Sequence, residues 1–330
     1  MTPRWEIVDG HVESFVWTRV LGYDLGARHG DGLLGGRYYS QADLPRMHEA
    51  GMAGAVMSIA TNPFRRAGRR TDVLMANLAR LRRSLGADPR VAVVSGHAGY
   101  RAARADGRLA CFLGVQGANA WSRPEDVIRT PEVTRATLVH LTDSPLGATS
   151  SPLGRSRGRQ GLTPVGREYV SALNQARMLV DLAHISRRGF WDALGAHDPD
   201  LPPVVSHTGV CGVFPSWRNL DDDQIRAVAD RGGVIGIMFH RGFLGRPARE
   251  VTADAVVAHL AHLIAVGGED VAALGSDYDG MIDPPRDLRT VVRWPALVDR
   301  MRAGGFSEDR VIRVLGGNYL RVVAAVRPAS

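Results

Sequence analysis

The sequence predicts an α/β fold, and within that class a (β/α)8 TIM barrel formed by a single domain, residues 1–330. Short apolar runs alternate with amphipathic stretches along the chain, which is typical of folds built from strand–helix units. Eight of these runs fit buried strands, the number that closes such a barrel. Side chains suited to metal binding or proton transfer follow seven of the eight runs, and barrel enzymes place their sites at the carboxyl ends of strands.

Each expected strand is a short, mainly apolar run bounded by polar or turn-forming residues. The eight runs are residues 5–8, 54–59, 109–115, 137–141, 178–183, 203–206, 234–239 and 271–275. The expected helices instead carry apolar residues at intervals of three and four. Six lie between strands, at residues 41–50, 72–85, 164–176, 187–194, 221–230 and 253–266, and two close the chain, at residues 294–303 and 317–326.

The composition is that of a soluble globular protein, with 45% hydrophobic and 23% charged residues. No apolar run is long enough to span a bilayer, and the first ten residues contain no apolar signal core. The two cysteines, Cys111 and Cys211, exclude a disulfide scaffold. We therefore expect a cytoplasmic enzyme with no membrane partner.

The net charge of +7 raises the question of a nucleic-acid partner. All 41 basic residues are arginine, which excludes lysine-based chemistry such as a Schiff base, a P-loop or a carboxylated lysine between two metals. The arginine clusters have no interleaved aromatic residues; they are Arg65, Arg66, Arg69 and Arg70, then Arg80, Arg82 and Arg83, then Arg155, Arg157 and Arg159. We interpret them as solvated surfaces, which favours a small anionic substrate over nucleic acid.

The residues at the strand ends are the main functional signal. In strand order they are His11 with Glu13, Ser58, Gln116, His140, His184, His207, His240 and Asp277. Any one histidine alone is more simply a hydrogen-bonded core or rim residue. Convergence of so many at one end of a barrel instead indicates a metal site.

The spacing of these residues suggests two metal-binding points. His11 and Glu13 are two residues apart at a strand end, so their side chains point the same way. His184 and His207, on adjacent strands, can offer imidazoles to a second point. Imidazole with carboxylate suits Zn²⁺, and also Fe, Mn, Co or Ni. Asp277 then fits an acid–base residue acting on a metal-bound water, the alternative being a turn-capping aspartate.

Two further features lie near the expected site. Arg218 follows the sixth strand, where a guanidinium can hold a substrate carboxylate; the alternative is a salt bridge at the start of a helix. The stretch 142–163 is long, aperiodic and rich in Ser, Gly, Pro and Arg, and we expect a lid or specificity loop there. It ends at Thr163, which with the following Pro164 forms a typical helix start.

Nearly the whole chain resembles the membrane (renal-type) dipeptidase family of the amidohydrolase superfamily. The resemblance rests on several motifs in order: Val-Asp-Gly-His at 8–11, Gly-Leu-Thr-Pro-Val-Gly-Arg-Glu at 161–168, Met-Leu-Val-Asp-Leu-Ala-His at 178–184, Val-Ser-His at 205–207, Arg-Asn-Leu at 218–220, Arg-Gly-Gly-Val-Ile-Gly at 231–236, Gly-Ser-Asp-Tyr-Asp-Gly at 275–280 and Leu-Gly-Gly-Asn-Tyr-Leu at 315–320. It implies an amidohydrolase-like barrel, two zinc ions bridged by a glutamate, dipeptide hydrolysis and a homodimer.

The resemblance also implies roles for single residues. His11 would bind the first metal ion, and His184 and His207 the second. His140 would hold the scissile carbonyl or its oxyanion, Arg218 would bind the substrate carboxylate, and Asp277 would be the catalytic acid and base.

Three positions depart from the family pattern. Glu13 stands where the family has aspartate, Gln116 stands at the bridging glutamate, and His240 stands at a tyrosine that helps to bind the substrate carboxylate. The change at Gln116 matters most, because a neutral amide leaves two dications about 3.5–4 Å apart to repel each other. Glu13 is one methylene longer than aspartate and is a candidate substitute bridge, and a register error with another acid such as Glu125 is a further alternative. We expect zinc as cofactor with weakened binuclear binding, so that one ion, two ions or none all stay open.

Three functions follow from these residues. The first is a metal-dependent, dipeptidase-like hydrolase of a small amide that bears a carboxylate. The second is a diverged biosynthetic enzyme on the same scaffold, with lyase, isomerase or hydrolase chemistry using one metal ion or none. The third is a binding protein without catalysis, which the retention of so many polar strand ends disfavours.

Overall fold

The protein is represented by a computed structural model, which describes residues 6–329 except residues 33, 61, 63–65, 153 and 157–159. The first residue of the expected strand 5–8 lies outside these residues, as do Arg65, Arg157 and Arg159 of the arginine clusters.

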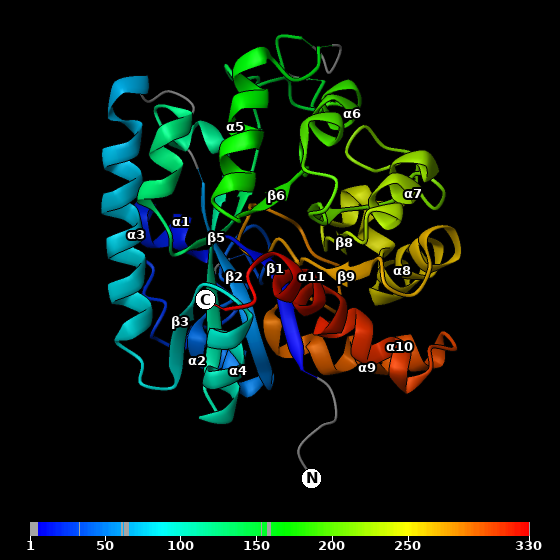
Figure 1. The fold of residues 1–330 in the computed structure, drawn as a ribbon. Coiled ribbons are helices and arrows are strands. Elements are labelled where there is room, and N and C mark those ends of the chain that lie inside the picture. Colours follow the sequence, from blue (N-terminus) through cyan, green and yellow to red (C-terminus); the bar gives the residue numbers. More distant parts are fainter. Residues whose placement is uncertain are drawn as a thin grey trace.

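Eight parallel strands form the expected barrel, with helices around them (Figure 1). In spatial order the strands are β1 (Ile7–Val12), β2 (Met52–Ala60), β4 (Leu109–Gln116), β5 (Val133–Thr137), β6 (Leu179–Asp181), β7 (Val204–Thr208), β8 (Val234–Ile237) and β9 (Ala272–Leu274). A further short strand, β3 (Val91–Val94), pairs with the first half of β4. The prediction of a TIM-barrel-like α/β fold is therefore confirmed.

The barrel closes between its first and last strands just beyond the end of β9. Val12 and Tyr278 form a parallel bridge. The amide of Glu13 donates to the carbonyl of Tyr278 over 2.9 Å, and the amide of Asp277 donates to the carbonyl of His11 over 3.0 Å. Closure therefore brings the expected residues of the first and last strands together at the same end of the barrel.

The helices follow the strands in the alternation that the sequence predicts. They are α1 (Ser14–Val20), α2 (Leu44–Glu49), α3 (Arg70–Gly86), α4 (His97–Ala105), α5 (Pro164–Gln175), α6 (Arg187–Ala196), α7 (Asp222–Asp230), α8 (Ala253–Gly267), α9 (Trp294–Ala303), α10 (Glu308–Ile312) and α11 (Asn318–Val326). Thr163 caps α5 by accepting a hydrogen bond from the amide of Gly166, as expected from the Thr-Pro start signal.

Some strands and helices differ from those predicted from the pattern of apolar residues. The expected strand 137–141 begins four residues too late, because the true strand β5 reads Val-Thr-Arg-Ala-Thr and is not an apolar run. Leu138 and Val139, which suggested a strand, are buried just beyond its end. Strand β3 and helices α1, α4 and α10 were not expected; each has nine residues or fewer, which gives little periodicity to detect.

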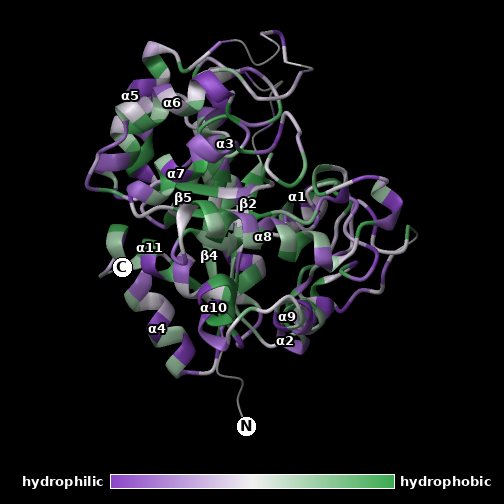
Figure 2. Ribbon diagram, turned by 90° about the vertical axis from the view of Figure 1, so that its right-hand side faces the viewer, coloured by the Kyte–Doolittle hydropathy of each residue, from purple (hydrophilic) through white to green (hydrophobic). Residues whose placement is uncertain are grey.

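Burial follows the expected pattern. Hydrophobic residues gather on the central strands β2 and β4, while the surrounding helices carry hydrophilic residues as well (Figure 2). Arg80, Arg82 and Arg83 are exposed on α3, as a solvated surface requires. No helix among the described residues is both long and apolar enough to cross a membrane.

The expected lid loop lies between β5 and α5 and is partly packed. Leu146 and Thr149 are buried, and the carboxylate of Asp143 accepts hydrogen bonds from the amides of Thr149 and Ser156, over 2.9 and 2.7 Å. Thr142, Ser144, Thr149 and Ser151 face the main cavity of the molecule. A role in lining the site follows from this position, while opening and closing stays a prediction.

Candidate active site

One cavity of about 560 Å³ brings the predicted site residues together. Seven of them line it: Glu13, Gln116, His140, His184, Arg218, His240 and Asp277. The other two, His11 and His207, are fully buried and reach the lining residues through their side chains. All nine residues named from the sequence therefore lie in one site.

The strands position these side chains in two ways. His11, Gln116 and His207 belong to the strands themselves. Four others each stand three residues beyond the end of a strand: His140 after β5, His184 after β6, His240 after β8 and Asp277 after β9. His184 and Asp277 have φ angles of 65° and 62°, a left-handed conformation that is strained for residues other than glycine. Such strain is concentrated at functional sites, where it aims side chains that an ordinary strand end would not.

His184 and His207 form the first of two clusters in the cavity. Their Nε2 atoms lie 2.8 Å apart, and the side-chain amide of Gln116 lies 3.0 Å from the former and 3.4 Å from the latter. Nδ1 of His207 lies 2.8 Å from Oγ of Ser206, whose hydroxyl donates to the carboxylate of Asp181 over 2.6 Å. Ser206 therefore accepts from Nδ1 of His207, which leaves Nε2 of His207 unprotonated and able to bind a cation.

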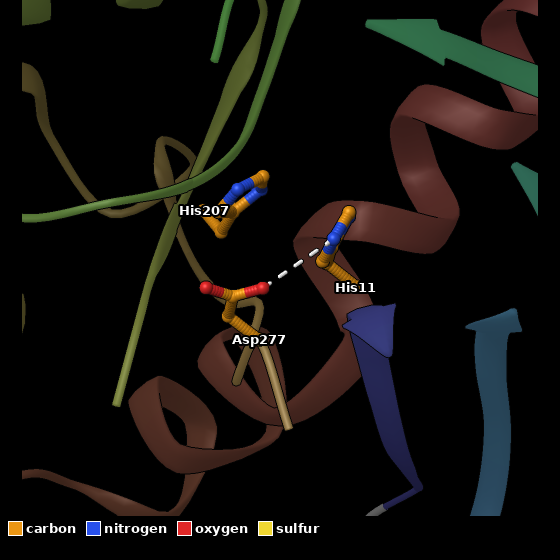
Figure 3. A group of neighbouring side chains, drawn as sticks. All are labelled: His11, His207 and Asp277. Atoms are coloured by element: carbon orange, nitrogen blue, oxygen red, sulfur yellow. Dashed lines mark ion pairs between the residues drawn. The ribbon is translucent and has the colours of Figure 1, made fainter. Parts of the chain in front are cut away.

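His11, Glu13 and Asp277 form the second cluster. Nε2 of His11 lies 3.3 Å from Oε1 of Glu13 and 3.6 Å from Oδ1 of Asp277. The His11 ring stacks on that of His207, with ring centroids 4.0 Å apart. One ligand atom from each of His11, His207 and Asp277 lies within 4.8 Å of the other two, and the Asp277 carboxylate stands beside the two imidazoles (Figure 3).

The donor atoms of this site fit a zinc-type ion at one of the two expected positions. Among the described residues, Nε2 of His11, Oε1 of Glu13 and Oε1 of Gln116 are buried without an aligned hydrogen bond. Buried polar atoms without partners are costly, and clusters of them commonly hold an ion. The two imidazoles of His184 and His207 suit one ion. The amide nitrogen of Gln116 faces them here, and a turn of the side-chain amide would bring its oxygen to the ion as a third ligand atom.

The charges of the site follow from its burial. Burial lowers the pKa values of His11, His184 and His207 well below the ordinary value, so all three imidazoles are neutral at neutral pH, as metal binding requires. Burial also raises the pKa of the Asp277 carboxyl to about 8, against the opposing effect of Arg218. The pKa of Glu13 is raised well above its usual range by burial and by the neighbouring Asp277.

Arg218 is a buried cation that faces the cavity. Only 4% of its surface is exposed, and it donates to the backbone carbonyl of His207 over 2.7 Å. Burial lowers its pKa to about 10, and within the described residues no carboxylate lies within ion-pair distance. The salt bridge at a helix start, which the sequence left open, is thus not formed, and Arg218 is free to bind an anionic group in the cavity.

Two histidines face the same space as neutral donors. Burial, together with the charge of Arg218, lowers the pKa of His140 to about 3. The backbone amide of Asp283 donates to Nδ1 of His240 over 3.1 Å, so neutral His240 carries its proton on Nε2. Both side chains can therefore donate hydrogen bonds to oxygen atoms of a bound molecule.

A buried layer of polar residues lies beneath the site, and of these residues the sequence pointed only to Ser58. Arg135 and Asp181 are fully buried in the barrel interior and form an ion pair. The signal was present, since an arginine in the middle of a strand has to find an acceptor inside the protein. It was hidden because the true strand β5 was not identified at these residues.

Comparison with known proteins finds similarity to dipeptidases along nearly the whole chain. The family model "Membrane dipeptidase (Peptidase family M19)" matches residues 2–330. A metallopeptidase of Rhodobacter sphaeroides, solved with a phosphinate mimic of the dipeptide L-Ala-D-Ala, is 26% identical with a TM-score of 0.83, and the alignment covers 98% of this chain and 99% of that one. A dipeptidase described as a metallopeptidase of family M19 is 27% identical with a TM-score of 0.86, covering 99% and 100%.

Two curated relatives match this chain over only part of their own length. An uncharacterised dipeptidase of Schizosaccharomyces pombe is 30% identical over 224 residues, which are 66% of this chain and 53% of the relative. An "uncharacterized protein in pqqA 5'region" of Klebsiella pneumoniae is 37% identical over 169 residues, 50% of this chain and 61% of the relative. The chain thus spans between half and two thirds of the length of these relatives.

Proposed function

Since the chain belongs to the membrane dipeptidase family, peptidase family M19, we propose that it is a metal-dependent hydrolase of a small amide that bears a free carboxylate, a dipeptide being the simplest case. The observation that carries this proposal is Arg218, a buried cation that has no carboxylate partner among the described residues, in the cavity that also holds His184 and, behind it, His207. A substrate carboxylate would supply the missing anion. The Rhodobacter sphaeroides neighbour was solved with a phosphinate mimic of a dipeptide, which supports a dipeptide as the substrate.

The residues of the cavity divide the work of hydrolysis. His184 and His207, with Gln116, would hold a zinc-type ion, which when bound polarises a carbonyl and lowers the pKa of a water molecule. Arg218 would bind the substrate carboxylate, with Nε2–H of His240 as a second donor, and so fix the position of the scissile bond.

Two further side chains act on the reacting atoms. His140 would donate a hydrogen bond to the carbonyl oxygen as negative charge develops there. Asp277 would accept a proton from the attacking water and pass it to the leaving nitrogen, so that a C–O bond forms as the C–N bond breaks. Burial raises the pKa of its carboxyl to about 8, and a bound metal cation nearby would lower this pKa towards the neutral range in which an acid–base residue works best.

The mouth of the cavity indicates an apolar substituent on the substrate. Val20, Leu141, Trp217 and Met281 line the cavity from four different loops or helix ends, and between 47% and 66% of each side chain is exposed. Exposed apolar groups gathered around a pocket usually mark a binding surface. We propose that they contact a large apolar side chain or acyl group next to the scissile amide.

A substrate panel tests the proposal. Zinc-loaded enzyme is given dipeptides with a free terminal carboxylate and the same dipeptides as terminal amides, and released amine is measured. Hydrolysis of the carboxylates, weak or absent hydrolysis of the amides and loss of activity in His184→Ala support the proposal. Equal hydrolysis of both sets argues against the role of Arg218, and a panel without turnover argues against peptidase activity.

The second candidate is a diverged enzyme that acts on another carboxylate substrate with one metal ion or none. Gln116 favours it, because a neutral amide occupies the position from which the family's bridging charge is expected. Such an enzyme would leave dipeptides intact yet turn over a native metabolite, with activity lost in Asp277→Asn. Ligand stabilisation without any turnover would instead identify a binding protein.

Three expectations from the sequence remain proposals. Zinc is the proposed metal because the donor set is two imidazoles and an amide oxygen. A cytoplasmic location and a homodimer are also proposed, and light scattering on purified protein would test the latter.

A further inference from the structure

Arg135 lies directly beneath the site and contacts it through a single imidazole. The residue is fully buried in β5, and its Nη1 forms an ion pair with Asp181. Its Nη2 donates to Oγ of Ser58 over 2.9 Å and contacts Nδ1 of His11 over 2.8 Å. The two hydrogens of Nη2 are thus shared between these two acceptors.

This contact fixes the protonation of His11. A guanidinium has donors only, so Nδ1 of His11 has to accept the hydrogen bond. A neutral imidazole that accepts at Nδ1 carries its proton on Nε2. A protonated nitrogen has no free lone pair and cannot bind a metal ion.

His207, whose ring stacks on that of His11, carries its proton on the other nitrogen. Its Nδ1 faces the Oγ of Ser206, which is committed as a donor to Asp181 and therefore accepts from the ring. The two stacked imidazoles of His11 and His207 thus hold opposite tautomers, although their ring centroids are only 4.0 Å apart. One presents a lone pair to the cavity and the other presents an N–H.

We infer that His11 is not a metal ligand in this protein, and that Arg135 is the positioning residue that gives it a different role. Nε2–H of His11 is presented to the carboxylates of Glu13 and Asp277, whose nearest oxygens lie 3.3 and 3.6 Å away. The chain then carries one cation site, at His184 and His207. The inference concerns metal binding alone and holds whichever substrate is turned over.

Two residues of this chain therefore oppose a binuclear site, and they act on different requirements. Gln116 is neutral and so places no negative charge between two ions. Arg135 keeps the proton of His11 on Nε2, so that this nitrogen has no lone pair for an ion. Replacing the first residue alone leaves the second in place. Gln116→Glu by itself should not create a second ion site, whereas Gln116→Glu combined with Arg135→Met should.

The Arg135→Met variant is expected to fold. Asp181 loses its cation but keeps four donors: Oγ1 of Thr137 at 2.6 Å, Oγ of Ser206 at 2.6 Å, the amide of Ser206 at 2.9 Å and the amide of Ala183 at 3.0 Å. A matched control is Arg327→Met, which removes another buried arginine, one that donates to the carbonyls of Val133 and Pro131 away from the cavity.

The experiment counts zinc ions per chain, by elemental mass spectrometry after chelation and reloading with zinc alone. We expect one ion in the native protein, in Gln116→Glu, in Arg135→Met and in Arg327→Met, and two ions in the double variant. Two ions in the native protein or in Gln116→Glu would overturn the inference, as would a single ion in a folded double variant.

A second measurement needs no variant of Arg135. Nitrogen-15 NMR of histidine-labelled native protein reports the tautomer of each ring, and His11→Gln assigns the His11 signals. With zinc bound, we expect a protonated Nε2 at His11 and an unprotonated Nε2 at His207. A metal-bound Nε2 at His11 would contradict the inference even if no Arg135 variant folds.

Discussion

The guanidinium of Arg218 donates a hydrogen bond to the backbone carbonyl of His207 over 2.7 Å. The cation proposed to bind the substrate carboxylate is thus attached to the strand that supplies an imidazole proposed to bind the metal ion. This attachment fixes the distance between the carboxylate site and the ion site. Such a fixed distance selects substrates by the separation of their carboxylate from the scissile bond.

Arg218→Met should remove this selection. We expect kcat/KM for a dipeptide with a free carboxylate to fall by the value of a buried charge pair, about 2–5 kcal/mol, or roughly thirtyfold or more. Hydrolysis of the corresponding dipeptide amide should change little, because it has no charge to bind. The readout is the ratio of the two kcat/KM values.

A half-buried arginine elsewhere provides the control. Arg321→Met removes a guanidinium that donates to the carbonyls of Gly232 and Asp270, outside the cavity. It should leave the ratio at its native value. An Arg218→Met enzyme that still prefers the free carboxylate would show that another group binds it.

Ser206→Ala should weaken zinc binding without changing the zinc ligands. The hydroxyl of Ser206 orients His207 and connects it to Asp181. Loss of such a partner typically lowers metal affinity about 10–100-fold. Competition with a zinc-binding dye measures the affinity; Ser186→Ala, which removes the cap of α6 instead, should leave it unchanged. Equal affinities in the native and Ser206→Ala proteins would argue against the assigned tautomer of His207.

Trp217→Ala should discriminate between large and small substrates. Trp217 stands at the cavity mouth and packs edge-on against Phe243, with ring centroids 5.2 Å apart. Burying a large apolar side chain is worth about 1.5–3 kcal/mol, so kcat/KM for dipeptides with a bulky apolar residue should fall at least tenfold. Values for Gly- or Ala-containing dipeptides should stay near native.

The chain offers a close control for this change. Trp191 packs edge-on against Phe190, also at 5.2 Å, but does not line the cavity. Trp191→Ala should affect neither class of substrate. If Trp217→Ala lowers kcat/KM equally for small and large substrates, the apolar mouth does not select the substrate.

The sequence predicted the barrel and the residues gathered in its cavity, and the reason is local. The strand runs before His184, His207 and Asp277 are apolar enough to identify, and a barrel brings all strand ends to one place. The fourth strand was predicted four residues too late, yet the prediction that His140 lies in the site was still correct. His140 stands three residues beyond the end of the true strand, as His184 stands three residues beyond the end of its own strand.

The layer beneath the cavity was not predictable in the same way. Which nitrogen of His11 carries the proton depends on a guanidinium 124 positions away in the chain. Nothing in the spacing of His11 and Glu13 reports that contact, so the pattern suggested a metal site. Long-range donors of this kind become visible only when the strands are placed side by side.

His140 allows a prediction about pH. Its pKa of about 3 reflects burial and the charge of Arg218, and a metal cation nearby would lower it further. The imidazole should therefore be neutral, and able to donate a hydrogen bond, at every pH from about 5 upward. His140→Leu should lower kcat by roughly 10²–10³-fold, the usual cost of losing one donor to a developing oxyanion.

The pH profile separates this role from that of an acid or base. In His140→Gln, which keeps a donor, kcat should recover part of the loss, and the acidic limb of the kcat profile between pH 5 and 8 should not move. His197→Gln, a change at a buried histidine outside the cavity whose pKa is also lowered, to about 4, should leave both kcat and the profile unaltered. A displaced acidic limb in His140→Gln would mean that His140 titrates during turnover and acts in proton transfer, the task proposed for Asp277.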